Sequence, residues 1–260
     1  MTQKERLIYL IEYLLKDGGY SDPVPEGEIA QRSLARALFN VREPKPVSDE
    51  FLRVQDEYLK ERAIERGITR LSELTALYGD FYLWKGDITT LECGAIVNAA
   101  NNRLLGCFVP GHKCIDNAIH TYAGVELRAE CNEVMKKQGH LEPTGKAKVT
   151  GAYNLPCDYV IHTVGPIVYG ALTDEHKKLL ADCYENCLIA AEEKGVESIA
   201  FCCISTGEFM FPNEAAAQIA VLTCKAYKER TASKIKIIFN VFKEKDNEIY
   251  AKVLGRYFPC

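Results

Sequence analysis

From about residue 82 onward, short apolar runs of strand length alternate with segments of helix length, and this alternation restricts the fold more than any other feature. The predicted strands span residues 82–84, 95–98, 147–150, 159–164, 199–203 and 235–241. The predicted helices span residues 114–123, 125–137, 175–194, 213–229 and 246–256. The run at residues 199–204 is apolar almost throughout, which is typical of a strand covered on both faces. The sequence therefore predicts a three-layer α/β/α domain with a mixed sheet.

The residues before this alternation predict a small helical lobe. Three helices are expected, from Thr2 to the glycine pair at residues 18–19, over residues 28–39, and from Ser48 to about Arg66. Thr2 and Glu5 have the spacing of a capping box, and Ser48 is a typical N-cap residue. We therefore divide the chain into a helical N-terminal lobe over residues 1–75 and an α/β domain over residues 76–260.

Composition and charge exclude several classes of protein. The net charge of -4 gives no general attraction for a phosphate backbone, so a nucleic-acid-binding protein is disfavoured. No apolar run approaches the ~20 residues that a membrane-spanning helix needs, and Glu12 interrupts the apolar stretch at residues 7–15. Most of the 11 cysteines lie singly in apolar segments, as reduced and buried thiols do. We expect a cytoplasmic protein without a membrane or nucleic-acid partner.

Five motifs occur in order along the α/β domain, and three of them fall at or directly after the end of a predicted strand. They are Gly86-Asp-Ile-Thr89, Ala95-Ile-Val-Asn-Ala-Ala-Asn101, Ile115-Asp-Asn-Ala-Ile-His120, Tyr159-Val-Ile-His-Thr-Val-Gly-Pro166 and Ile204-Ser-Thr-Gly207. In open α/β sheets, the loops after the carboxyl ends of strands line the ligand site. The succession resembles the macrodomains of the protein-ADP-ribosylhydrolase branch, from about residue 82 to the C-terminus. The resemblance implies a macrodomain fold that binds ADP-ribose in this crevice.

The loop between the second and third motifs departs from the glycine-rich pattern usual in macrodomain hydrolases. It reads Leu105-Gly-Cys-Phe-Val-Pro-Gly-His-Lys-Cys-Ile-Asp116. This loop is similar to that of the zinc-dependent macrodomains of some bacteria and fungi, which also carry an N-terminal helical segment. Cys107, His112 and Cys114 are ligand types that zinc prefers, and three protein ligands leave the fourth position open, as in catalytic sites. The alternatives are that the three are unrelated loop residues, or that His120 or Asp116 closes the site.

The resemblance assigns catalysis to Asp116 and Asn101. Asp116 begins a predicted helix, where a carboxylate is favourable even without a function. The resemblance places it near the distal ribose, where it can orient or deprotonate a water or stabilise an oxocarbenium-like transition state. Asn101 is expected to bind the distal ribose and Asn98 to shape the same loop, whereas Asn102 is equally typical of a turn. Zinc would either activate a water or hold the ribose hydroxyls and polarise the leaving group, and the sequence leaves both open.

The resemblance assigns the other ADP-ribose contacts to two further segments. The backbone N–H groups of residues 205–209 are suited to hold the diphosphate. Glu208 is acidic and is therefore expected to point away, whereas Phe209 occupies the position of an aromatic residue beside the distal ribose. Asp87 is the expected acceptor for the adenine amine, and the Ile88 backbone contacts the ring. The predicted ADP-ribose set is Asp87, Ile88, Asn98, Asn101, Asn102, Ser205, Thr206, Gly207, Glu208 and Phe209, with Asn240 and Phe242 as further candidates for the adenine pocket.

Three functions remain open for such a pocket. The first is a hydrolase that removes ADP-ribose from mono-ADP-ribosylated proteins. It is favoured because Asp116 and the loop with Cys107, His112 and Cys114 (the metal loop) would lie at the scissile bond. The second is a non-catalytic reader of ADP-ribosylated partners, and the third is a hydrolase of small ADP-ribose derivatives. The zinc-dependent class is associated with a sirtuin-type ADP-ribosyltransferase and a lipoyl-carrier protein, which makes an ADP-ribosylated carrier protein a candidate substrate.

Overall fold

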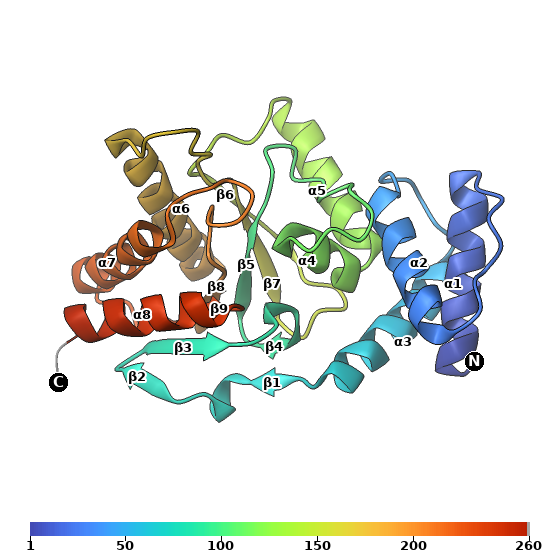
Figure 1. Ribbon diagram of the computed structural model, residues 1–260, viewed down its shortest axis with the longest axis horizontal. Coiled ribbons are helices and arrows are strands. Elements are labelled where there is room, and N and C mark those ends of the chain that lie inside the picture. The colour runs from blue at the N-terminus through green and yellow to red at the C-terminus, as the bar shows by residue number, and fades with distance from the viewer. Residues whose placement is uncertain (259–260) are drawn as a thin grey trace.

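The computed structural model describes residues 1–258 and places a helical lobe beside an α/β domain (Figure 1). The lobe consists of α1 (Gln3–Gly18), α2 (Glu28–Val41) and α3 (Asp49–Arg66). Thr2 and Glu5 form the predicted capping box of α1, and Ser48 is the N-cap of α3. The three helices share an apolar core of their own, which also includes Val125 of the α/β domain. The domain boundary near residue 75 stays a prediction.

The α/β domain is built on a seven-stranded sheet with the strand order β2-β3-β9-β8-β5-β7-β6. The strands are β2 (Ala76–Tyr78), β3 (Phe81–Lys85), β5 (Ala95–Ala99), β6 (Ala147–Gly151), β7 (Tyr159–Thr163), β8 (Ser198–Phe201) and β9 (Lys236–Val241). The strands from β3 to β7 in this order run parallel, whereas β2 and β6 are antiparallel to their neighbours. All four residues of β8 are buried, as expected for a strand covered on both faces. The mixed sheet is therefore confirmed.

Helices cover both faces of this sheet, which gives the predicted three layers (Figure 1). The five helices of this domain are α4 (Ile115–Ala123), α5 (Val125–Gln138), α6 (Asp174–Glu193), α7 (Asn213–Thr231) and α8 (Glu244–Tyr257). On one face, α4 packs on β5 and α5 on β6, and on the other α6 packs on β6 and β7 and α8 on β3 and β9. The lobe contacts the domain mainly through α2 and α3, which both pack on α4. No helix within residues 1–258 is long and apolar enough to cross a membrane.

The structure adds short elements that the sequence pattern did not predict. Besides β2, these are β1 (Thr69–Arg70) and β4 (Leu91–Glu92), which form a separate parallel pair, and the 3-10 turns η1 (Leu71–Glu73) and η2 (Ile88–Thr90). Segments of two or three residues are too short to show a periodic pattern, so they leave no signal in the sequence. The strand predicted at residues 199–203 ends at residue 201, because Cys202 and Cys203 already belong to the loop that enters the cleft.

Candidate active site

A cleft of about 1180 Å³ lies at the carboxyl ends of the parallel strands β3, β5, β8 and β9. The predicted site residues that line it are Asp87, Ile88, Asn101, Asn102, Cys107, His112, Cys114, Asp116, Ser205, Thr206, Gly207, Glu208 and Phe209. Asn240 and Phe242, the further candidates for the adenine pocket, line it as well, whereas Asn98 does not. Parallel strands bring their carboxyl ends to one edge of a sheet, which is why loops far apart in the sequence meet here.

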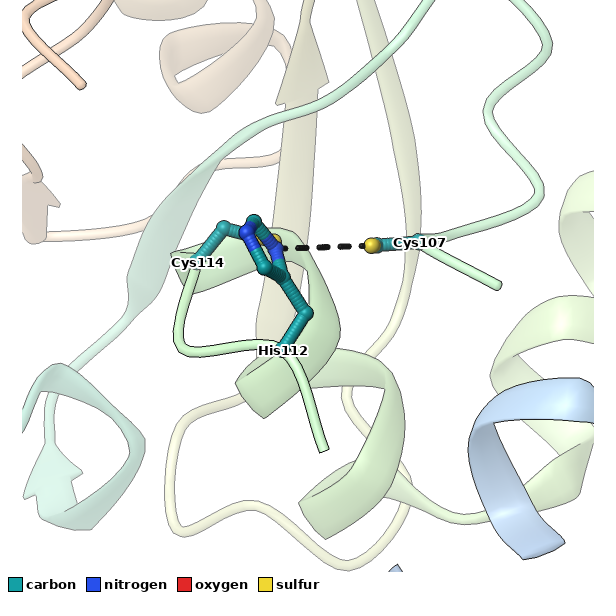
Figure 2. Close-up of side chains that lie close together, drawn as sticks. All are labelled: Cys107, His112 and Cys114. Carbon is teal, nitrogen blue, oxygen red and sulfur yellow. Dashed lines mark hydrogen bonds between the residues drawn. The ribbon is translucent and has the colours of Figure 1, made fainter. Parts of the chain in front are cut away.

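Cys107, His112 and Cys114 come together on the wall of this cleft. Figure 2 shows the sulfur of Cys107 pointing toward the other two side chains, which directly precede α4. The ligand atoms of all three lie within 4.8 Å of one another, and Cys107 Sγ is 3.6 Å from His112 Nδ1. Bonds of ~2.3 Å from zinc to sulfur and ~2.0 Å from zinc to nitrogen can span such distances in tetrahedral geometry. The three residues therefore fit a zinc ion.

The surroundings of this group also fit a bound cation. Burial raises the pKa of Cys114 to about 12, and a bound cation would act in the opposite direction, because it stabilises the thiolate. Neither His120 nor Asp116 joins the group in the part of the chain that the structure describes. Because His112 turns Nδ1 toward Cys107, its Nε2 is left for Glu208, whose Oε1 lies 3.5 Å away. Glu208 thus points toward the metal loop, in the manner of the carboxylates that orient metal-bound histidines.

Asp116 is held in a fixed orientation at the base of the cleft. Its Oδ1 accepts a hydrogen bond of 2.8 Å from Asn98 Nδ2, and its Oδ2 accepts one of 3.2 Å from Asn101 Nδ2. Burial raises the pKa of Asp116 to about 6, although the hydrogen bond from Asn98 and the charge of Arg128 act in the opposite direction. A buried carboxylate with two amide donors and access to the cleft is suited to orient a water or a ribose hydroxyl.

Asn98 lies beneath the cleft and not on its wall, so its predicted contact with ADP-ribose stays a prediction. This side chain is fully buried. Its Nδ2 donates to Asp116 and, over 3.1 Å, to Nδ1 of His162. His162 uses its other nitrogen, Nε2, toward Thr150 Oγ1 at 2.9 Å. Asn98 therefore positions Asp116 from below the cleft.

The loop of residues 205–209 offers unused hydrogen-bond donors to the cleft. Within residues 1–258, the backbone N–H groups of Ser205, Gly207, Glu208 and Phe209 donate no hydrogen bond. Ser205 has a left-handed backbone (φ 64°), and a Cβ at Gly207 would meet no atom within 4 Å. Successive free N–H groups around an open space form a typical anion-binding site, as the sequence predicts for the diphosphate.

At the other end of the cleft, Asp87 contacts a residue that the sequence analysis missed. Its Oδ1 accepts from the backbone N–H of Thr89 at 3.0 Å, and its Oδ2 accepts from Arg66 Nη1 at 3.0 Å. Arg66 is the last residue of α3 in the lobe. Asn240 Nδ2 donates to the backbone oxygen of Gly86 at 3.0 Å and so supports the same turn. No pattern in the sequence indicated Arg66, because the motifs that predicted the site all lie outside the lobe.

Known proteins resemble this chain along nearly its whole length. Residues 97–220 match the family described as Macro domain. A protein-ADP-ribose hydrolase of Treponema medium is 55% identical, over 98% of this chain and 100% of that protein. The structure of an Oceanobacillus iheyensis macrodomain with ADP is 37% identical with a TM-score of 0.62, and the match covers 68% of this chain and 90% of that one. A Trypanosoma brucei macrodomain in complex with ADP-ribose is 28% identical with a TM-score of 0.65, over 84% of this chain and 95% of that one.

The fold and the cleft at the carboxyl ends of the parallel strands are those of a macrodomain. The chain belongs to the macrodomain family.

Proposed function

We propose that this chain is a zinc-dependent hydrolase that removes ADP-ribose from mono-ADP-ribosylated proteins. One observation carries the proposal: the Asp116 carboxylate and the Cys107, His112 and Cys114 group line the same cleft as the free N–H groups of residues 205–209. A site with an anion cradle, a fixed carboxylate and metal ligands is suited to hold the diphosphate of an ADP-ribosyl group and to hydrolyse the bond at the anomeric carbon of its distal ribose. The name of the Treponema medium relative, protein-ADP-ribose hydrolase, supports the same activity.

In the proposed complex, ADP-ribose lies along the cleft with adenine beside Asp87 and Ile88. The diphosphate accepts hydrogen bonds from the loop of residues 205–209, and the distal ribose then reaches Asn101 and Asp116. The Trypanosoma brucei macrodomain with bound ADP-ribose, whose match covers 84% of this chain, supports the choice of ligand. A lipoyl-carrier protein as substrate and a cytoplasmic location stay predictions from the sequence.

The reaction adds water across the bond between ADP-ribose and the protein side chain. Asp116, fixed by Asn98 and Asn101, orients the attacking water and accepts its proton, or stabilises positive charge on the anomeric carbon. The hydroxyl joins the anomeric carbon and the released side chain gains a proton. Cys107, His112 and Cys114 would hold the zinc ion. Such an ion supplies a Lewis acid that either lowers the pKa of a bound water or grips the ribose hydroxyls.

The proposal is tested by the release of ADP-ribose from modified proteins that carry Ser-, Asp/Glu- or Arg-linked ADP-ribose. We expect Asp116→Asn to lower kcat by at least about 100-fold, since general acid–base groups contribute on this scale. The Kd for ADP-ribose should change little. Asp174→Asn is the matched control, because Asp174 also begins a helix but is fully exposed and far from the cleft residues.

The two alternative functions give different results in the same assay. A reader would bind ADP-ribose tightly without turnover, even with zinc added. An enzyme for small ADP-ribose derivatives would hydrolyse ADP-ribose phosphate or acetyl-ADP-ribose faster than any modified protein. Loss of turnover on protein substrates when a chelator is added, and its return with zinc, would support the metal requirement.

A further inference from the structure

Helix α2 of the lobe contacts the loop of residues 107–114, first through Arg36. Arg36 donates from Nε and Nη2 to Oδ1 of Asn117, at 3.1 Å and 2.9 Å. Its Nη2 also donates to the backbone oxygen of His112 at 3.0 Å. One planar guanidinium therefore binds both the backbone of a metal-ligand residue and the first turn of α4. The forked geometry of arginine fixes the orientation of both partners, which a lysine cannot do.

A second residue of α2 binds the turn just before His112. Asn40 is fully buried, its Oδ1 accepts from the backbone N–H of Gly111 at 2.9 Å, and its Nδ2 donates to Oγ1 of Thr121 at 2.9 Å. Gly111 has a left-handed backbone (φ 65°) that any other residue would find strained. The Asn40 side chain thus ties this turn to the body of α4.

Asn117 extends the contact from α2 to the two cysteines. Its Nδ2 donates to the backbone oxygens of Cys107 at 3.4 Å and Val109 at 3.1 Å. Its backbone N–H points at Sγ of Cys114 at 3.4 Å. Because Arg36 holds the side-chain oxygen of Asn117, all three ligand residues connect to α2 either directly or through one intermediate residue, Asn117.

The C-terminal end of α2 is itself held by an arginine of the α/β domain. Arg128 of α5 donates to the backbone oxygens of Phe39 at 3.0 Å, of Arg42 and of Leu105 at 2.7 Å. It therefore joins the C-terminal end of α2 to the residue two places before Cys107. The segment of residues 107–114, in contrast, contains no helix or strand. A loop without secondary structure needs such contacts to keep three ligands in metal-binding geometry.

We propose that Arg36 and Asn40 are positioning residues that hold the loop of residues 107–114 in its metal-binding geometry, so that the helical lobe is a working part of the metal site. The proposal rests on the proposed function, which supplies the metal. Second-layer contacts of this kind change metal affinity by about tenfold to 100-fold when they are removed.

The experiment measures Co²⁺ binding by the full chain, from the absorbance that cobalt gains when thiolates bind it. We expect Arg36→Met and Asn40→Ala to raise the Kd for Co²⁺ by about tenfold to 100-fold. Arg36→Lys should not restore binding, because it returns the charge without the fork. Arg32→Met is the matched control: Arg32 lies one turn earlier on α2 and, among residues 1–258, forms its ion pairs with Glu28 and Glu65 of the lobe. Circular dichroism checks that each variant is folded.

The outcomes separate this proposal from the proposed function. Equal Co²⁺ affinity in Arg36→Met and Arg32→Met overturns the positioning role. Because Arg36 also lines the cleft, weaker ADP-ribose binding with unchanged Co²⁺ affinity would mean that it contacts the ligand instead, and this too overturns it. Wild-type protein that binds Co²⁺ but releases no ADP-ribose contradicts the hydrolase alone, and the affinity ratio still decides the role of α2. Wild-type protein that binds no Co²⁺ contradicts both.

Discussion

Within residues 1–258, two groups of cysteine and histidine side chains have the composition of a zinc site, yet they differ in access and in what their nitrogen atoms contact. They are the cleft group (Cys107, His112 and Cys114) and the buried group (His120, Cys131 and His162). The ligand atoms in each group lie within 4.8 Å of one another. Distance and composition therefore do not distinguish them, and the difference must come from accessibility and from free lone pairs.

In the buried group, His162 has no nitrogen left for a metal. Its Nδ1 faces Asn98 and its Nε2 faces Thr150, and burial lowers its pKa to about 4. In the cleft group, His112 keeps Nδ1 directed at Cys107 and all three side chains line the cleft. A metal site thus needs uncommitted lone pairs and a path for the ion. His162 of the buried group instead supports Asp116 through Asn98.

The largest expected difference between the two groups appears when one cysteine is replaced in each of them. We expect wild-type protein to carry about one zinc per chain, and Cys107→Ala to carry none. Turnover in Cys107→Ala should fall by at least about 100-fold, since a Lewis acid contributes several kcal/mol to the transition state. Cys131→Ala, the matched variant of the buried group, should keep its zinc and its turnover. Elemental analysis measures the metal, and two zinc ions per wild-type chain would break the comparison.

A smaller effect is expected from His162, the residue that holds Asn98 from below. His162→Phe should lower kcat about tenfold and leave KM and zinc content unchanged, which is less than the ~100-fold cost of displacing a reacting group by 1 Å. The physical reason is that Asn98 loses an acceptor and holds Asp116 less firmly. His162→Gln offers a donor and an acceptor again and should restore most of kcat. If kcat followed only the melting temperature of the variants, His162 would be a packing residue and nothing more.

The sequence predicted the part of the cleft that its motifs form, because these motifs follow strands that can be recognised in the sequence. The segments around Asp87, Asn101 and residues 205–209 all follow parallel strands, whose apolar runs are recognisable one by one. The contacts of Asn98 were not predicted, because this residue lies inside β5 and its partners depend on the register with β7. That register pairs Asn98 with His162, and no local pattern reveals it.

The contribution of the lobe could not be predicted in this way. Arg36 lies on α2 and Arg66 on α3. The sequence pattern of each helix indicates which of its faces packs within the lobe, and nothing about contacts outside it. Their contacts with His112 and Asp87 depend on how two separately packed cores meet, which is a tertiary property. The first and third helices themselves followed from capping residues, and the second from the prolines on either side of it, since these signals are local.

The smallest expected effect concerns Nε2 of His112, the nitrogen that does not face Cys107. In the cleft group, Nε2 of His112 faces the carboxylate of Glu208, whereas in the buried group Nε2 of His162 faces the hydroxyl of Thr150. We expect Glu208→Gln to weaken Co²⁺ binding about threefold to tenfold, below the usual range for such carboxylates, because the Glu208 side chain is 72% exposed and water screens it. Glu214→Gln, an acidic residue in the first turn of α7, is the control. An unchanged Co²⁺ affinity would show that the loop of residues 205–209 serves the diphosphate alone. A modest loss of affinity would mean that this loop also supports the metal loop across the cleft.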